Sequence, residues 1–232
     1  MADRTLKVGI IIGSTRVVRV GPQVAKFLLD TFKTAGPDAS APSPDLELQS
    51  RTQIDLIDLK DYNLPIFDEP VIPNRVFKPE GYANEHTRVW SRKIASYDAF
   101  VFLSAQRNWG IPAELKNSID YLFNEWKGKP AMIVSFGGHG GEQAADQIKT
   151  VLGAIGMRVV PRIVSMAFPS RDVLTKAFAG EDLGLDATND EGPWAEHRAT
   201  LRDVFWDDTI AKTLVPTLGL TAEGLGTWKE EK

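Results

Sequence analysis

The chain of 232 residues contains no cysteine and only three histidines. The absence of cysteine excludes a disulfide framework, a thiolate nucleophile, and zinc or iron–sulfur sites built on cysteine. Long hydrophobic runs are absent as well, because the apolar stretch near the start, Leu6 to Ile12, is too short for a signal peptide or a membrane span. We therefore expect a cytoplasmic protein without membrane contact.

An excess of positive charge is also absent. Lys and Arg number 27 against 31 Asp and Glu, which gives a net charge of −4 and a pI of about 5.5. No basic stripe indicates a nucleic-acid partner, so an anionic ligand must be bound by local arginines. The composition, 43% hydrophobic and 25% charged, is typical of an ordinary globular domain with a sizeable core.

Five apolar runs rich in β-branched residues stop abruptly in small and polar residues, which is typical of buried parallel strands. They cover Leu6 to Ile12, Gln53 to Leu59, Ala99 to Ser104, Ala131 to Phe136 and Arg158 to Val164. Four helical patterns separate them, around Val24 to Phe32, Glu85 to Ser96, Pro112 to Leu122 and Glu142 to Ile155. This alternation predicts an α/β fold with a doubly wound, five-stranded parallel sheet of order 2-1-3-4-5.

The domain organisation follows from this pattern. We expect residues 1–164 to form the α/β domain, with a Pro-, Ala- and Ser-rich surface loop at 35–44. Residues 165–232 hold a polar stretch and an amphipathic run from Trp194 to Leu214. They are expected to be a helical extension that packs on the body or on a second subunit, not an independent domain.

The loop Gly13-Ser14-Thr15-Arg16 lies between the first strand and the following helix. Free backbone N–H groups, the helix dipole, two hydroxyls and a guanidinium there favour a phosphate monoester. The alternative is a capped helix with a solvated arginine. Because ligands of such sheets bind beyond the carboxyl ends of the strands, we expect a small-molecule site at this edge.

Four segments together resemble the NADPH-dependent FMN reductase family of flavodoxin-like quinone and azo-dye reductases. They are Gly13 to Arg16, Asn108 to Leu122, Lys129 to Ala131 and Ser135 to Gly141, within a similarity that spans roughly residues 6 to 164. The resemblance implies a flavodoxin-like fold, FMN at the sheet edge and NADPH or NADH as hydride donor. It also implies a small-molecule electron acceptor and a homodimer in which both subunits shape each site.

The resemblance and the loop chemistry together give the expected FMN-binding residues. These are Ser14, Thr15, Arg16 and Gly21 in the first loop, Gln106, Arg107, Asn108, Trp109 and Gly110 in the second, and Ser135, Gly137, Gly138, His139 and Gly140 in the third. Glycines let backbone N–H groups approach a planar ring, and an aromatic side chain can stack on it. No metal site and no catalytic side chain are expected, because the flavin carries the chemistry.

One loop departs from the family pattern. Where the family commonly has Pro-Glu-Tyr-Asn or Pro-Gln-Tyr-Asn, this chain has Ala105-Gln106-Arg107-Asn108. Arg107 either lies over the edge of the flavin ring and favours the anionic reduced form, or it points to solvent or pairs with an acid such as Glu125.

Other side chains also have two interpretations. Lys116 and Asp120 are expected to form an ion pair on one helix. The acids Asp58, Asp61, Asp68 and Glu69 are expected to be solvated loop residues and not a Mg²⁺ site. Trp90, Phe123 and Trp126 are packing residues or, at a dimer interface, aromatic anchors, and Pro65-Ile66-Phe67 resembles the loop that forms the family's subunit contact.

The leading hypothesis is an FMN-dependent NAD(P)H oxidoreductase that reduces quinones or similar acceptors in a ping-pong cycle. The alternative is a flavodoxin-like protein with weakened or lost FMN binding, acting as a binding or regulatory module or as a lineage-specific biosynthetic enzyme. The fold alone does not separate these hypotheses. A yellow purified protein favours the first, and a colourless one that ignores added FMN favours the others.

Overall fold

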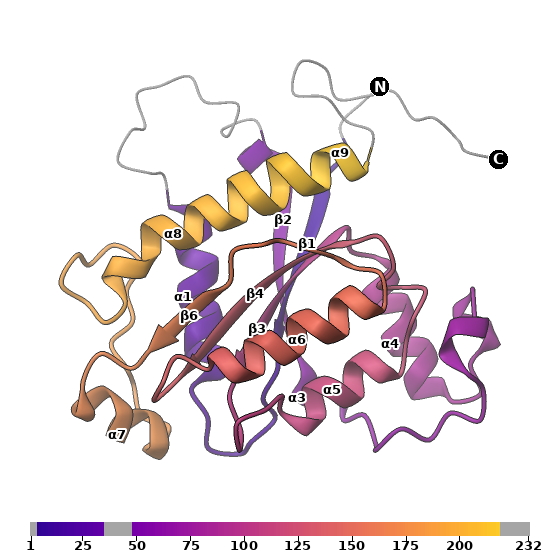
Figure 1. Cartoon of the computed structure of the whole chain (residues 1–232), viewed down its shortest axis with the longest axis horizontal. Helices are drawn as coiled ribbons and strands as arrows, with labels where there is room; N and C mark the ends of the chain where they lie inside the picture. The colour runs from indigo at the N-terminus through magenta and orange to yellow at the C-terminus, as the bar shows by residue number, and fades with distance from the viewer. Residues whose placement is uncertain (1–3, 35–47, 219–232) are drawn as a thin grey trace.

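The computed structural model describes residues 4–34 and 48–218, so the expected surface loop at 35–44 lies outside the described residues. It shows a parallel sheet of order β2-β1-β3-β4-β5 with helices on both faces (Figure 1). The strands are β1 (Leu6–Ile12), β2 (Thr52–Asp58), β3 (Ala99–Ala105), β4 (Pro130–Gly137), β5 (Arg158–Val159) and β6 (Val164–Ala167). The predicted fold class and strand order are confirmed.

The central strands are apolar along their whole length because both faces are covered. In β3, Val101 and Leu103 belong to one core cluster, whereas Phe100 and Phe102 belong to the cluster on the opposite face. Successive side chains of a strand point to opposite faces, so an uninterrupted apolar run is what a sheet between two helical layers requires.

The helices divide between the two faces of the sheet. Buried residues of α1 (Gly21–Lys33) share one core cluster with the C-terminal helix. The opposite cluster contains buried residues of α4 (Glu85–Ala95), α5 (Ala113–Asp120) and α6 (Glu142–Ala154). Short elements in the connection between β2 and α4 are α3 (Leu59–Tyr62), η1 (Pro73–Arg75) and η2 (Pro79–Gly81).

The prediction of a single fifth strand from Arg158 to Val164 is wrong, because the structure has two short strands in this region. β5 ends at Val159, and β6 begins only at Val164, although both pair with β4. Pro161 lies between them, and proline has no N–H with which to continue the ladder. The interruption leaves β6 free to run alongside the end of β4, where Val134 pairs with Val164 and Gly137 with Ala167.

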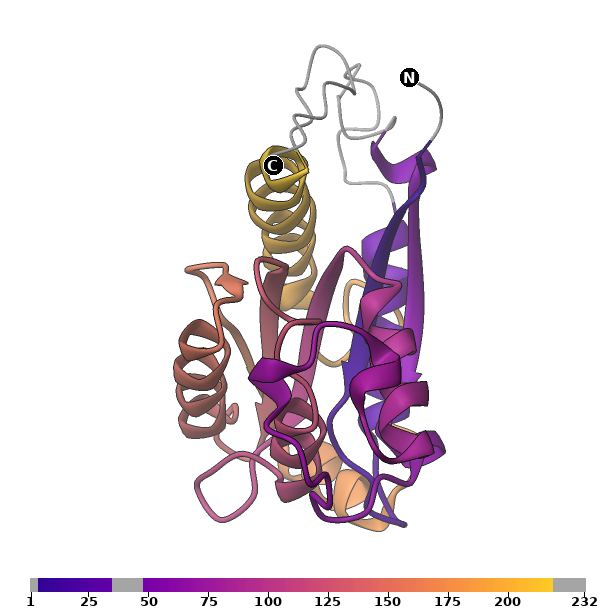
Figure 2. The same ribbon diagram turned by 90° about the vertical axis from the view of Figure 1, so that its right-hand side faces the viewer.

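The C-terminal region contains α7 (Arg171–Ala179) and then η3 (Ala195–His197), α8 (Arg198–Arg202), η4 (Asp203–Leu214) and α9 (Val215–Thr217). From α8 to α9 the ribbon is one continuous helix, which Figure 1 shows along its length and Figure 2 nearly end-on. Its Phe205 stacks on Phe32 of α1 with ring centroids 4.0 Å apart, and the indole N–H of Trp206 donates to the Phe32 carbonyl over 2.9 Å. This helix is therefore part of the main core.

Trp90 and Trp126, for which the sequence allowed either core packing or a dimer interface, are core residues. Trp90 and Trp126 are fully buried, and their indole N–H groups donate to the carbonyls of Ser118 and Ile119. Their interpretation as anchors of a dimer interface is wrong. The expected ion pair between Lys116 and Asp120 on α5 is confirmed at 2.6 Å. Among the described residues, no helix is long and apolar enough to cross a membrane.

Candidate functional site

A cleft of about 150 Å³ opens beyond the carboxyl ends of β1, β3 and β4. The strand order reverses between β1 and β3, which is where ligands of open parallel sheets bind. Its walls come from the loop after β1, the end of β3 with its loop, the end of β4, and α7. The lining residues are Ser14, Arg16, Val18, Arg19, Val20, Gly21, Ala105, Gln106, Arg107, Phe136, Gly137, Gly138, Phe168, Ala177 and Phe178.

Gly13 brings the first loop close to the neighbouring strand. Its N–H donates to the carbonyl of Leu103 over 2.8 Å, and a Cβ at this position would lie only 2.9 Å from that same carbonyl oxygen. A side chain would push the two strands apart, so glycine is required here. The next residue, Ser14, is consequently held against the cleft and is only 6% exposed.

Three guanidinium groups face the cleft, and two of them are held by acids. Arg19 forms a bidentate pair with Asp58 at the end of β2, and Arg107 pairs with Glu114 in the first turn of α5. Neither acid lines the cleft. Arg16 is exposed and has no hydrogen-bonding or ionic partner among the described residues. The cleft is therefore lined by positive groups beside the N-terminus of α1, which suits an anion.

Of the alternatives for Arg107, the structure shows pairing with a nearby acid, but Glu125 is the wrong acid. Glu125 instead accepts hydrogen bonds from the hydroxyls of Ser91 at 2.6 Å and Tyr82 at 3.2 Å. Glu114 is the acid that pairs with Arg107, at 2.8 Å, and it lies on the first turn of the helix that follows the same loop.

The loop after β3 is a two-residue turn. Arg107 and Gly110 exchange backbone hydrogen bonds of 3.1 and 2.9 Å, while Asn108 and Trp109 have φ of 46° and 63°. Positive φ at both central residues matches a tight hairpin turn. The turn places Trp109 at the rim of the site, 65% exposed, with its ring stacked on His139 at a centroid distance of 6.1 Å.

The loop after β4 is fixed by a buried serine hydroxyl at the end of that strand. The buried Ser135 hydroxyl lies 2.8 Å from the carbonyl of Gly140 and 2.9 Å from the hydroxyl of Ser165. Gly140 has φ of 74°, which favours glycine. Gly137 and Gly138 line the cleft, and a Cβ on either would meet a single atom within 4 Å. Their bare backbone therefore leaves open space for a ligand.

The structure gathers half of the expected binding residues at the cleft. Those that line it are Ser14, Arg16, Gly21, Gln106, Arg107, Gly137 and Gly138. Those that do not line it are Thr15, Asn108, Trp109, Gly110, Ser135, His139 and Gly140. Thr15 instead lines a separate pocket together with Glu114, whose carboxylate accepts its N–H over 3.0 Å.

The sequence analysis missed several residues of the site, among them three that line the cleft and Glu114, which lies behind Arg107. Arg19 follows Arg16 by one helical turn's spacing in the same loop, so a second arginine was a usable signal. Glu114 is an acid in the first turn of a helix, where acids are common for reasons unrelated to ligands. Phe168 and Phe178 belong to the C-terminal region, and nothing in their local pattern indicates that α7 covers the cleft.

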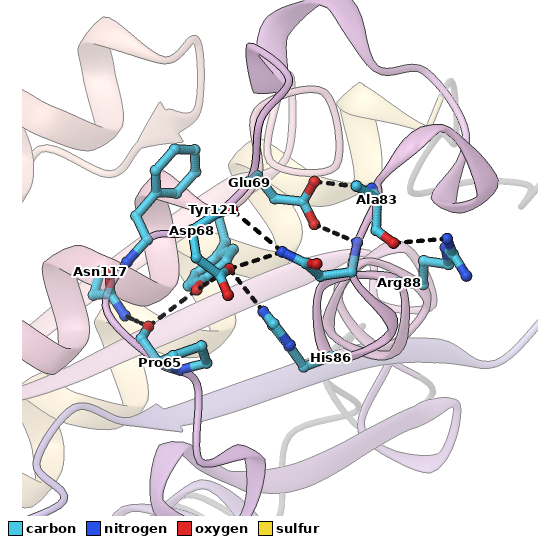
Figure 3. A network of polar contacts seen from close by, with 10 residues as sticks. Pro65, Asp68, Glu69, Ala83, His86, Arg88, Asn117 and Tyr121 are labelled. Carbon is cyan, nitrogen blue, oxygen red and sulfur yellow. Dashed lines mark hydrogen bonds and ion pairs between the residues drawn. The ribbon is translucent and has the colours of Figure 1, made fainter.

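A second polar cluster fixes the loop from Pro65 to Glu69 (Figure 3). Asn117 of α5 accepts from the N–H of Phe67 over 2.9 Å and donates to the carbonyl of Pro65 over 2.7 Å. The Asp68 carboxylate lies 2.9 Å from the hydroxyl of Tyr121 and 3.0 Å from the ring nitrogen of His86. His86 belongs to α4 and Tyr121 directly follows the last residue of α5, so the loop is attached to the domain.

These contacts change the titration of the cluster. Partial burial opposes ionisation of Asp68, but its hydrogen bonds with His86 and Tyr121 hold the pKa of this carboxyl below its usual value. Burial, and then the hydrogen bond to Asp68, raise the pKa of Tyr121 to about 12. Glu69 is only 6% exposed and accepts from the N–H groups of Ala83 and Asn84, so its interpretation as a solvated acid is wrong.

The fixed loop presents apolar side chains to solvent. Ile66 is 90% exposed and Phe77 is 77% exposed, and Phe67 and Ile72 are exposed between them in the sequence. We call these residues, Ile66, Phe67, Ile72 and Phe77, the apolar loop surface. A group of exposed apolar residues on a fixed loop is typical of a contact surface.

Comparison with known proteins gives concordant matches. The family model described as NADPH-dependent FMN reductase matches residues 6–169. NAD(P)H-dependent FMN reductase LOT6 of Saccharomyces cerevisiae is 41% identical over 157 residues, which cover 67% of this chain and 78% of that protein. NAD(P)H-dependent FMN reductase ntnL of Nectria sp is 37% identical over 191 residues, which cover 82% and 88% of the two chains.

Solved structures agree on the fold. The flavoenzyme NAD(P)H:(acceptor) oxidoreductase FerB of Paracoccus denitrificans matches with a TM-score of 0.59 at 20% identity, covering 88% of this chain and 97% of that one. The azoreductase AzrA matches with a TM-score of 0.51 at 15% identity, covering 85% and 99%. At such identities these structures bear on the fold alone.

Proposed function

Because this chain belongs to the NADPH-dependent FMN reductase family, we propose that it binds FMN in the cleft and transfers hydride from NADPH or NADH to a quinone or similar small acceptor. The observation that carries the proposal is the exposed guanidinium of Arg16, which has no partner among the described residues and faces the same cleft as Ser14 and Arg107. Such an arrangement suits a phosphate monoester.

The residues present fit FMN in three respects. The phosphate end finds guanidinium groups and a hydroxyl beside the N-terminus of α1. Gly137 and Gly138 offer bare backbone to a planar ring. Phe136, Phe168 and Phe178 supply apolar walls, as ligand pockets generally do.

The protein's own contribution is binding and positioning. When bound, FMN supplies the hydride chemistry. Arg16 and Ser14 hold the phosphate and thereby fix the cofactor relative to the loops after β3 and β4. Trp109 and His139 stack at the rim, where they limit access of water and acceptor to the site. No side-chain acid or base is assigned a role, because the bound flavin would supply the hydride chemistry.

We also propose that donor and acceptor use the same place in turn, which gives a ping-pong order in which the oxidised nicotinamide leaves before the acceptor enters. Initial rates measured against NADPH at several fixed quinone concentrations test this order. Parallel lines in double-reciprocal plots support ping-pong transfer, and lines that converge exclude it. Repeating the series with an azo dye as acceptor tests how far the acceptor range extends.

A homodimer is part of the same proposal. The four residues of the apolar loop surface are exposed, and polar contacts from Asn117 hold the part of it that contains Ile66 and Phe67. Association of two copies would remove it from water. A cytoplasmic location remains a prediction, which microscopy of the tagged protein in cells tests.

A further inference from the structure

Arg107 occupies the place where the resembled family has a tyrosine, yet its guanidinium lies at the first loop. Nη2 donates to the hydroxyl oxygen of Ser14 over 2.9 Å. Nη1 donates to Oε2 of Glu114 over 3.0 Å, and Nη2 lies 2.8 Å from Oε1 of the same carboxylate. Arg107 therefore joins the loops after β1 and β3 directly.

The carboxylate of Glu114 approaches Arg107 from behind the cleft. Arg107 lines the cleft and Glu114 does not. The hydrogen bonds to Glu114 and Ser14 use one hydrogen of Nη1 and one of Nη2. The N–H of Nε and the second hydrogen of Nη1 have no acceptor among the described residues and remain for a ligand. Glu114 also accepts the N–H of Thr15, so it holds the guanidinium and the first loop in one arrangement.

The bond from Arg107 also sets the role of Ser14. A guanidinium only donates, so the Ser14 oxygen acts as the acceptor and keeps its own proton for another partner. Ser14 is only 6% exposed, lines the cleft, and its hydroxyl proton has no acceptor among the described residues. A buried hydroxyl without an acceptor favours a ligand oxygen at that position.

We propose that Arg107 binds the phosphate of the flavin and orients the Ser14 hydroxyl towards it, and that it does not act at the ring. This inference rests on the proposed function and goes further by assigning phosphate selectivity to the loop after β3. Arg16, Arg19 and Arg107 against Asp58 and Glu114 leave one positive charge in excess around the cleft. That excess attracts a phosphate monoester and gives no advantage to a neutral ligand.

The experiment compares FMN with riboflavin, which has the same ring and ribityl chain but no phosphate. The apo-protein is titrated with each flavin, and quenching of flavin fluorescence gives the two dissociation constants. For Arg107→Gln the FMN dissociation constant is expected to rise about tenfold or more, because a charge-assisted hydrogen bond is lost. The riboflavin dissociation constant is expected to stay within about twofold, since only the phosphate contact is removed.

Two further variants complete the design. Arg107→Lys keeps the charge but cannot bond Ser14 and both oxygens of Glu114 together, so its FMN affinity is expected between wild type and Arg107→Gln. Arg162→Gln is the matched control. Arg162 pairs with Asp208 and does not line the cleft. The two side chains are 46% and 14% exposed, which is similar to the 38% and 18% of Arg107 and Glu114. Far-ultraviolet circular dichroism establishes that each variant is folded.

Each outcome decides the question. A loss of affinity for FMN with unchanged affinity for riboflavin supports the inference. If Arg107→Gln does not fold, the same comparison is made with Arg107→Lys alone. Equal losses for FMN and riboflavin place Arg107 at the ring and overturn it, and so do unchanged constants for both flavins. If the wild-type protein binds neither flavin, the proposed function itself fails. If the wild-type protein binds FMN and Arg107→Gln binds it equally well, only the inference about Arg107 fails.

Discussion

Phe205 of the C-terminal helix lies flat on Phe32 of α1, with ring centroids 4.0 Å apart and an interplanar angle of 7°. Both rings are fully buried in the core cluster that covers one face of the sheet. The C-terminal helix thus packs against α1 and β4 and helps to cover this face of the sheet, as a doubly wound fold requires.

This packing predicts a large loss of stability for Phe205→Ala. Truncating a buried phenylalanine removes its apolar contacts and leaves a cavity, so we expect the free energy of unfolding to fall by about 3–5 kcal/mol. Urea unfolding followed by circular dichroism measures the change. Val17→Ala, which truncates an exposed side chain outside the cleft lining and outside the apolar loop surface, is the control and is expected to change the free energy little. A loss below about 1 kcal/mol for Phe205→Ala would show that the C-terminal helix is an accessory segment.

Lys129 predicts a specific pH dependence of stability. Burial lowers the pKa of this lysine to about 8, and its ammonium donates to the carbonyl of Ile94. In the unfolded chain a lysine titrates near about 10.4, so between pH 8 and that value the unfolded state binds more protons. Stability from this group therefore rises as pH increases through the window, by roughly 3 kcal/mol, and is lowest below pH 8.

The variant Lys129→Met isolates that contribution. The difference in unfolding free energy between wild type and variant should change across the window from pH 8 to about 10.4, in favour of wild type at the higher pH. Lys149→Met, at an exposed position on α6, serves as the control. A difference that stays constant with pH would mean that folding does not lower the pKa of Lys129.

Arg16→Ala tests the phosphate end of the site. A charge-assisted hydrogen bond contributes about 1.5–3 kcal/mol to the binding free energy, so its loss should raise the FMN dissociation constant roughly ten- to a hundredfold. Fluorescence titration measures it, with Arg75→Ala as a control for removing an exposed arginine away from the cleft. Unchanged affinity in Arg16→Ala would exclude this residue from the site.

The apolar loop surface predicts the oligomeric state. Sedimentation should give twice the 25.6 kDa mass of the chain, and Ile66→Asp should shift the protein towards monomer because a buried charge without a partner is costly. Val89→Asp changes an exposed apolar residue of α4 outside this surface and should leave the mass unchanged. A wild-type protein that remains monomeric at high micromolar concentration would contradict the dimer.

The sheet could be predicted from the sequence because its signals are local. An apolar run such as Val101 to Leu103, followed by polar residues, indicates a buried strand wherever it occurs. The interruption at Pro161 is equally local and was missed, since the apolar residues on both sides of the proline fit one strand.

The site was predictable only in part, because its remaining contacts depend on a turn and on the placement of a helix that no local pattern determines. Gly13, Ser14 and Arg16 carry their signal in one loop between a strand and a helix. The pairing of Arg107 with Glu114 depends on the turn at Asn108, whose positive φ redirects the chain towards α5. The contribution of Phe178 depends on how α7 lies over the cleft, which no local pattern determines.

The most direct test of the central claim is an anaerobic titration of the protein after it has been saturated with FMN and freed of excess by gel filtration. The account predicts about one FMN per chain, full bleaching of its absorbance by one equivalent of NADPH or NADH, and its return on addition of a quinone. Protein that leaves the column colourless, or bound flavin that neither nicotinamide bleaches, would contradict it.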